Sequence, residues 1–61
     1  MEKFDGNFWL TVLRVGCPLY LYHVNDDGEI EVFSRQGTGK RWTLKDDGQA
    51  RIFWATHRQD T

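Results

Sequence analysis

The tripeptide Asp-Asp-Gly occurs twice in this 61-residue chain, at Asp26-Asp27-Gly28 and at Asp46-Asp47-Gly48, 20 positions apart. Apolar residues stand on both sides of each copy. Asp-Gly is a favoured sequence for tight hairpin turns, because glycine adopts a positive φ without steric penalty. The repeat therefore predicts two β-hairpins of the same kind.

Two turn types fit each copy, and they bury different side chains. In the first hairpin, a type I turn followed by a G1 bulge pairs Val24 with Ile30, Tyr22 with Val32 and His23 with Glu31. In the second hairpin, the same turn pairs Leu44 with Ala50, Trp42 with Ile52 and Thr43 with Arg51. A two-residue type I′ turn instead pairs Val24 with Glu31 and Leu44 with Arg51. Because this one-residue slip mixes apolar with charged side chains, we predict the bulged turn in both hairpins. One face of the sheet then carries Tyr20, Tyr22, Val24, Ile30, Val32, Trp42, Leu44, Ala50, Ile52 and Trp54.

The rest of the chain also favours strands. Residues 8–15 are rich in β-branched and aromatic side chains, Asp5-Gly6 and Gly16-Cys17-Pro18 are typical of turns, and residues 49–56 form the last strand. No window shows a convincing helical period. The sequence thus predicts an all-β single domain over residues 1–61, a five- or six-stranded antiparallel meander without a helix. Since one flat sheet would leave apolar surface in water, we expect a small barrel or strongly twisted sheet that self-associates.

Composition restricts the classes of protein that remain. The net charge of −1 excludes bulk electrostatic attraction to nucleic acid or membrane, so any such contact needs a local patch. The single cysteine, Cys17, cannot form an internal disulfide, which favours a reducing compartment. No apolar run approaches the length of about 18 residues that a membrane span requires, and the first residues do not resemble a signal peptide. We expect a cytoplasmic protein without membrane contact.

Strand order in a meander also predicts a charge separation, because alternate turns lie at opposite ends of the sheet. One end collects the carboxylates of Asp5, Asp26, Asp27, Glu29, Asp46 and Asp47. The other end collects Arg14, Arg35, Lys40, Arg41, His57 and Arg58. Within that basic end, residues 35–42 combine two glycines, three cationic side chains and Trp42, a combination that suits an anion. A mobile, solvated connection between strands is nevertheless the favoured interpretation of this segment, with an anion or nucleic-acid contact as the alternative, and the spacing does not match a P-loop.

The catalytic and metal-binding patterns are weak. His23 opposite Glu31 fits an acid–base pair, but a cross-strand ion pair on a solvated face is the simpler explanation, and we favour it. Cys17, His23 and His57 lack any recognised zinc spacing, and neither Asp-Asp-Gly copy has the ligand series of a calcium loop. We expect no enzyme activity, no cofactor and no metal.

The sequence thus favours a non-enzymatic interaction module that self-associates and binds a protein partner. The predicted binding residues are Arg14, Arg35, Lys40, Arg41, Arg58 and two exposed aromatics, Phe33 and Phe53. A chain of this size suits a regulator or inhibitor of another protein, of the kind carried by phages and mobile elements. The alternative is a single-stranded nucleic-acid binder that uses the same basic end.

Overall fold

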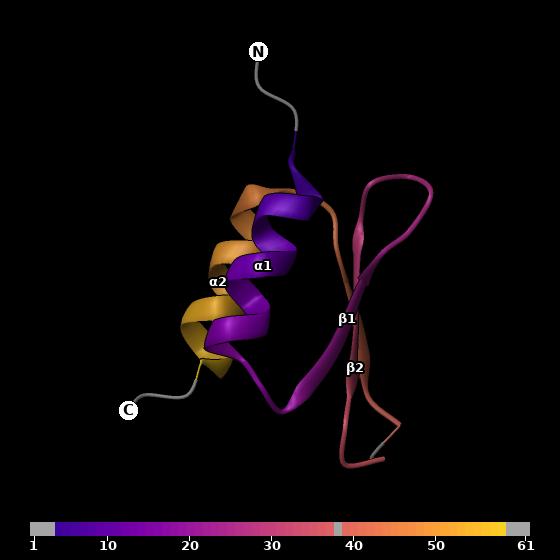
Figure 1. The fold of residues 1–61 in the computed structure, drawn as a ribbon, viewed down its shortest axis with the longest axis vertical. Helices are drawn as coiled ribbons and strands as arrows, with labels where there is room; N and C mark the ends of the chain where they lie inside the picture. Colours follow the sequence, from indigo (N-terminus) through magenta and orange to yellow (C-terminus); the bar gives the residue numbers. More distant parts are fainter. Residues whose placement is uncertain (1–3, 38, 59–61) are drawn as a thin grey trace.

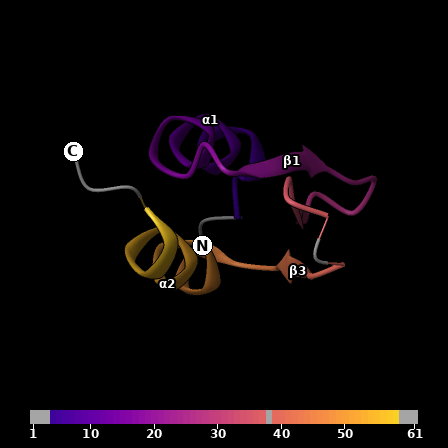
Figure 2. The ribbon, with the colours of Figure 1, turned by 90° about the horizontal axis from the view of Figure 1, so that it is seen from below.

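The structure, a computed structural model, describes residues 4–37 and 39–58 and contains both helices and strands. The elements follow the order α1 (Gly6–Gly16), β1 (Tyr20–Val24), β2 (Ile30–Ser34), β3 (Arg41–Leu44) and α2 (Asp47–His57). The three strands form one antiparallel sheet in the order β1-β2-β3. Both helices lie on the same face of that sheet, so the fold has a helical layer and a sheet layer (Figures 1 and 2).

The all-β prediction is therefore wrong: the fold is α+β, with three strands in place of five or six, and it is not a barrel. The two segments predicted as the first and last strands, residues 8–15 and 49–56, lie within α1 and α2. A curled sheet is not needed to cover the apolar face, because the helices cover it. The buried residues come from every layer: Leu13, Cys17, Tyr22, Ile30, Val32, Leu44, Ala50 and Phe53.

Helix α1 forms although its sequence is rich in residues that favour strands. Asp5 caps its N-terminus, where the carboxylate accepts hydrogen bonds from the N–H groups of Asn7 and Phe8 at 3.1 and 3.2 Å. Asp5-Gly6 is thus a helix start and not the predicted tight turn. The helix ends before Pro18, which cannot continue it. The polar residues Asn7, Thr11 and Arg14 recur at helical spacing and are all exposed, so a helical period is present in α1. The strand prediction was wrong because it relied on the β-branched and aromatic residues of the segment instead of on this spacing.

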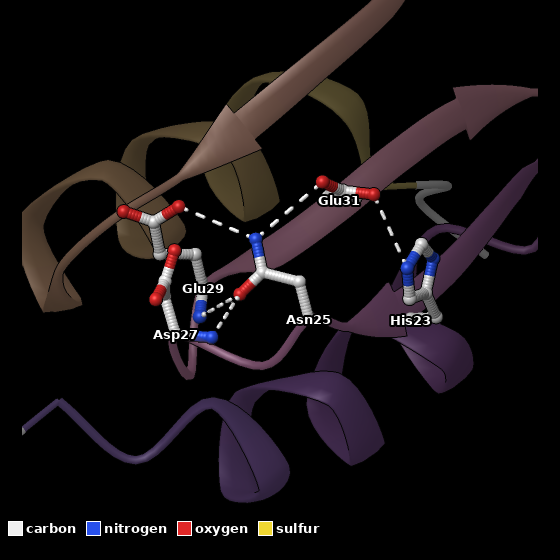
Figure 3. A network of polar contacts seen from close by, with 5 residues as sticks. All are labelled: His23, Asn25, Asp27, Glu29 and Glu31. Atoms are coloured by element: carbon white, nitrogen blue, oxygen red, sulfur yellow. Dashed lines mark hydrogen bonds and ion pairs between the residues drawn. The ribbon is translucent and has the colours of Figure 1, made fainter.

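The first Asp-Asp-Gly forms the predicted bulged hairpin turn. The observed register pairs Val24 with Ile30, Tyr22 with Val32 and His23 with Glu31, and Gly28 has a φ of 84°. The Asn25 side chain stabilises the turn, since its Oδ1 accepts from the N–H groups of Asp27 and Glu29 at 2.9 and 3.0 Å (Figure 3). The register of the first hairpin is confirmed, together with its turn type.

The second Asp-Asp-Gly begins a helix, so the second predicted hairpin and its register are wrong. Asp46 is the N-cap of α2, and its carboxylate accepts from the N–H of Gln49 at 2.9 Å. The Gln49 side chain accepts in turn from the N–H of Lys45, also at 2.9 Å. The residue before the tripeptide differs between the two copies: the Asn25 side chain accepts hydrogen bonds from N–H groups of the turn, whereas Lys45 has no side-chain acceptor for such bonds.

Two glycines allow the layers to approach closely. A Cβ on Gly6 would lie 2.6 Å from the carbonyl oxygen of Gly28, so the start of α1 rests directly on the β1–β2 turn. A Cβ on Gly16 would overlap the indole of Trp54, with Cδ1 at 2.8 Å, so the end of α1 accommodates the side chain from α2. The N-termini of both helices thus lie near the β1–β2 turn, and both helices run toward the β2–β3 connection (Figure 1).

Candidate functional site

The molecule has an acidic end and a basic end, as the sequence predicted, although the connections differ. The acidic end contains the β1–β2 turn and both helix N-termini, with Asp5, Asp26, Asp27, Asp46 and Asp47 (Figure 1). The basic end contains the β2–β3 connection and both helix C-termini, with Arg14, Arg35, Lys40, Arg41 and Arg58. The two helices run in the same direction between these ends, so α1 and α2 replace the predicted outer strands without changing which charges share an end.

This charge distribution complements the helix dipoles. Helix N-termini carry partial positive charge and C-termini partial negative charge. Asp5, Asp46 and Asp47 lie at the positive ends, and Arg14 and His57 lie in the last turns at the negative ends. Part of the positive charge at the basic end is therefore offset by the exposed carbonyl groups of the helices, which lowers the attraction of this end for phosphate.

The predicted basic residues do not form one compact cluster. The Arg35 guanidinium donates to the carbonyl of Pro18 at 3.2 Å, and the Arg58 guanidinium lies 4.7 Å from the centre of the Trp54 ring. Arg14 is exposed on α1, whereas Lys40 and Arg41 are exposed beside and on β3. The structure thus distributes these side chains over α1, the β2–β3 connection, β3 and the end of α2, and Lys40 and Arg41 are adjacent at the start of β3.

The two predicted aromatic binding residues, Phe33 and Phe53, differ in their exposure. Phe33 is half-buried on the sheet face that points away from the helices, where it stacks on His23 with ring centres 6.0 Å apart. Phe53 is only 4% exposed and belongs to the core, so the expectation of an exposed side chain is wrong. The second hairpin register would have placed Phe53 on the outer face, but its position in α2 turns it toward β1 and β3.

An apolar groove of about 400 Å³ runs between β3 and α2. Its lining consists of Trp42, Thr43, Leu44, Gln49, Ile52, Phe53, Thr56 and His57. Trp42 and Phe53 are in edge-to-face contact with ring centres 5.2 Å apart, and His57 stacks on Phe53 at 4.0 Å, so three ring side chains in mutual contact line the groove. Ile52 at the rim is 68% exposed although it is a large apolar residue.

The groove follows a free strand edge. In the sheet formed by residues 4–37 and 39–58, β3 is an edge strand, with β2 on one side only. The N–H of Ser34 donates to the carbonyl of Lys40 at 3.2 Å, and hydrogen-bonded pairs alternate along an antiparallel ladder. The main-chain groups of Trp42 and Leu44 therefore face β2, whereas those of Arg41 and Thr43 face outward, along the groove.

A second apolar surface lies on α1, on the side away from the sheet. Phe8 is 59% exposed and Val15 is 81% exposed, and Val12 lies between them at helical spacing. The neighbouring side of the helix is occupied by α2, because the indole N–H of Trp9 donates to the Asp47 carboxylate at 2.9 Å. Phe8, Val12 and Val15, here called the α1 stripe, form an apolar surface without a covering element in the described part of the chain.

The His23–Glu31 pair forms as predicted. His23 Nε2 lies 3.1 Å from a Glu31 oxygen on the outer sheet face, and the other Glu31 oxygen accepts from Asn25 at 3.4 Å (Figure 3). The imidazole is about half exposed, and the pair extends the polar network that stabilises the β1–β2 turn. This arrangement gives the pair a structural role in the hairpin. Within residues 4–37 and 39–58, no group of three or more His, Cys, Asp or Glu side chains could hold a metal ion.

Burial perturbs two groups beneath α1. Burial raises the pKa of the Cys17 thiol, and a hydrogen bond with Tyr22 opposes part of this effect. Burial also raises the pKa of the Tyr22 hydroxyl far above its usual range, and the Cys17 side chain adds to the shift. Tyr22 donates to the Cys17 carbonyl at 2.9 Å. Both groups stay protonated near neutral pH, so Cys17 is a core residue and lacks the thiolate of a nucleophile.

Fold and groove together define a small two-layer α+β domain with an open sheet edge. Neither the family models nor the curated proteins nor the solved structures that were compared with the chain gave a match. No helix among the described residues is long and apolar enough to cross a membrane.

The groove was not predicted from the sequence. Ile52, Thr56 and Gln49 line it because residues 47–57 are helical, and the strand prediction assigned these side chains to a sheet. Two signals in the sequence indicate the helix. Asp46 and Gln49 have the spacing of a capping box, and Ala50, Phe53, Trp54 and His57 recur at helical spacing.

Proposed function

We propose that the chain is a non-enzymatic interaction module that binds a segment of a protein partner in the groove between β3 and α2. The observation that carries this proposal is the groove itself, an apolar cavity of about 400 Å³ beside an unpaired strand edge. Binding sites for peptides combine apolar pockets with main-chain groups that are free to hydrogen-bond, and β3 offers both. A cytoplasmic location and a regulatory role remain predictions from the sequence.

The proposed module also self-associates through the α1 stripe. A second copy related by a twofold axis would place Phe8 of one chain against Val15 of the other, with the two α1 helices antiparallel. Antiparallel packing brings the basic end of one copy toward the acidic end of its partner, for example Arg14 toward Asp5. Charge complementarity therefore favours this arrangement over the parallel one, in which like charges would meet.

A single-stranded nucleic acid is the second candidate ligand, and one observation favours it: Lys40 and Arg41 are exposed next to each other at the basic end. Three features weigh against it. Phe53, the proposed stacking residue, is buried; both helix C-termini point toward this end; and Arg58 is already stacked on Trp54. Protein binding remains the better supported proposal.

Selection of random linear peptides against the immobilised protein tests the groove. The expected result is a set of peptides that bind, perturb the NMR resonances of Thr43, Ile52 and Thr56, and lose at least tenfold in affinity on Ile52→Gln. Arg51→Gln is the matched control, because Arg51 is exposed on the same helix and does not line the groove. Failure to enrich any peptide, or resonance changes confined to other surfaces, would contradict the proposal.

Light scattering coupled to gel filtration tests self-association of the 7.2 kDa chain. We expect a dimer at about 100 µM that dissociates on Val15→Glu and weakens as salt is raised. Ala55→Glu is the control, since it adds the same charge to an exposed position on α2, away from the α1 stripe and outside the groove lining. A wild-type monomer at this concentration, or equal effects of the two variants, would refute the role of the α1 stripe.

A further inference from the structure

We propose that the free edge of β3 binds an extended segment of the partner as an additional strand, and that this segment alternates acidic with apolar side chains. The inference rests on the proposed function, since it names the chemistry of what the groove between β3 and α2 receives. Four features of the described residues support it: the free main-chain groups, the position of the groove, the charge of β3 and the sequence of β2.

The main-chain groups define the geometry of the added strand. Arg41 and Thr43 each present one N–H and one C=O to the edge, because the groups of Trp42 and Leu44 pair with β2. The next outward N–H, that of Lys45, is already bonded to the Gln49 side chain at 2.9 Å. The open part of the edge is therefore short, and a partner segment of about five residues covers it.

The groove accepts every second side chain of such a segment. Successive residues of a strand point to opposite faces of a sheet. Side chains that point toward the helical layer enter the space bordered by Leu44, Ile52 and Phe53, which is apolar. Side chains that point the other way lie on the outer face of the sheet. The alternation of an added strand therefore requires apolar residues at every second position.

Charge on the outer face selects acidic residues for the remaining positions. Thr43 and Arg41 lie on that face, and Lys45 follows at the same spacing. Lys40 precedes the strand and by the same alternation does not share this face, so Arg41 and Lys45 are its cations, and the carboxylate of Asp46 is already engaged as the N-cap of α2. Opposite charges across neighbouring strands are stabilising, so carboxylates fit beside Arg41 and Lys45.

The chain itself contains a strand of this composition. On its other edge β3 pairs with β2, in which Glu31 stands opposite Thr43 and the apolar residues Ile30 and Val32 face the core. Extending the register by one residue places Glu29 opposite Lys45. The segment Glu29-Ile30-Glu31-Val32 thus alternates acidic and apolar side chains, and β3 already accommodates this pattern on one edge.

A second copy of the chain does not fit the same edge through its own β3. Symmetric antiparallel pairing centred on Thr43 would place Arg41 of one copy opposite Lys45 of the other. Like charges directly opposite each other are destabilising, and basic residues on an edge strand prevent such pairing in many proteins. The β3 edge and the α1 stripe are therefore separate surfaces with different occupants.

A fluorescent peptide copy of residues 28–34, GEIEVFS, tests the proposal by anisotropy titration. Binding is expected to weaken at least tenfold when both glutamates are replaced by lysine. In an added antiparallel strand, the residues directly opposite Arg41 and Thr43 have their side chains on the same outer face as these two residues. The two glutamates of the peptide occupy that face. Because Arg41 and Thr43 direct their main-chain groups to the open edge, the glutamates opposite them direct their own N–H groups to β3. N-methylation of both glutamates should thus abolish binding, whereas N-methylation of the Ile and Val residues should leave it within about threefold.

The two methylated peptides also distinguish strand addition from a replacement of β2 by the peptide. In β2 the N–H groups of Ile30 and Val32 bond to β3, so a peptide that replaced β2 would lose binding when its Ile and Val residues are N-methylated. On the protein side, Thr43→Pro removes an outward N–H and should reduce affinity at least tenfold, with Thr43→Val as control. Circular dichroism establishes whether Thr43→Pro is folded. If it is not, the methylated peptides still decide the question.

Three results of the peptide titrations would overturn the inference: equal binding of the lysine peptide, equal binding of both methylated peptides, or no binding of GEIEVFS at millimolar concentration. Displacement of the peptide by an oligothymidylate, with steep salt dependence, would instead identify a polyanion site and also overturn it. Failure of this inference can be distinguished from failure of the proposed function. If either of the first two results is found but random-library peptides still bind in the groove, the groove is a binding site that does not use strand addition.

Discussion

Replacing the glycine of each Asp-Asp-Gly tripeptide by alanine separates the two conformations that the same sequence adopts. Gly28 has a φ of 84°, whereas Gly48 lies in the first turn of α2 and does not have a positive φ. We expect Gly28→Ala to destabilise the protein and Gly48→Ala to leave it unchanged or more stable. The two variants make the same chemical change, so each is the control for the other.

The magnitudes follow from the backbone. A left-handed conformation costs a non-glycine residue about 1–2 kcal/mol. Alanine also lowers the conformational entropy of the unfolded chain, which stabilises the folded state by about 0.4–1 kcal/mol. Gly28→Ala should therefore lower the free energy of unfolding by about 1 kcal/mol. In a helix, alanine is favoured over glycine by about 0.5–1 kcal/mol. A Cβ on Gly48 would lie 3.3 Å from the capping oxygen of Asp46, which offsets part of this gain.

Thermal unfolding followed by far-UV circular dichroism measures the difference. In a domain of this size each kcal/mol shifts Tm by about 4–8 °C, so the two variants should be separated by about 5–15 °C, with Gly28→Ala lower. Urea unfolding at 25 °C provides the same comparison as a free energy. Equal destabilisation by both substitutions would mean that both glycines occupy hairpin turns, and it would refute the helical start of α2.

Three further predictions concern packing and pH. Gly16→Ala should cost about 1–3 kcal/mol in urea unfolding, because the added methyl overlaps the Trp54 indole; an unchanged midpoint would contradict the contact between the helices. Phe53→Ala should cost about 3–5 kcal/mol and unfold much of the population, whereas a loss below 1 kcal/mol would show that Phe53 is not in the core. The raised pKa values of Tyr22 and Cys17 mean that the folded state holds these protons more tightly than the unfolded state. The contribution of these two groups to the free energy of unfolding should therefore be constant below about pH 8 and decrease as pH rises through 9 to 11, by up to about 1.4 kcal/mol per pH unit for each group, with a smaller slope in Tyr22→Phe.

The sequence determined the first hairpin because its signals are local. Asn25 and Gly28 meet the requirements of a bulged turn, and strict alternation after the turn leaves one register that buries the apolar residues. The charge separation also followed, since Asp5, Asp46 and Arg14 stand at element ends in either topology. In such cases a few adjacent residues contain the information, and tertiary contacts agree with it.

The helices were missed because their sequences satisfy two periods at once. Val12 and Val15 favour strands by propensity. Residues 8–15 are apolar at both odd and even positions, so the sequence does not indicate that the Val15 side chain is exposed. In α2 the alternation from Gln49 to Ile52 resembles a strand, and only the adjacent Phe53 and Trp54 break it. Tertiary contacts, such as the Trp54 indole on Gly16, then stabilise helices whose local signals are ambiguous.

The groove depends on this assignment. Its walls come from β3 and α2, which are adjacent in sequence, but a hairpin at residues 46–48 would have filled the edge of β3 with a neighbouring strand. The helix instead leaves the main chain of Arg41 and Thr43 free. The capping of α2 by Asp46 therefore creates the open edge on which the proposed function depends.

Amide hydrogen exchange at Thr43 tests the central claim most directly. In the free protein this N–H faces the open edge, so it should exchange rapidly while the N–H of Trp42, paired with β2, is protected. Addition of GEIEVFS should slow exchange at Arg41 and Thr43 at least tenfold and leave the amides of α1, such as that of Thr11, unchanged. A Thr43 amide that is already protected in the free protein, or that stays unprotected when the peptide is bound, would contradict strand addition at β3.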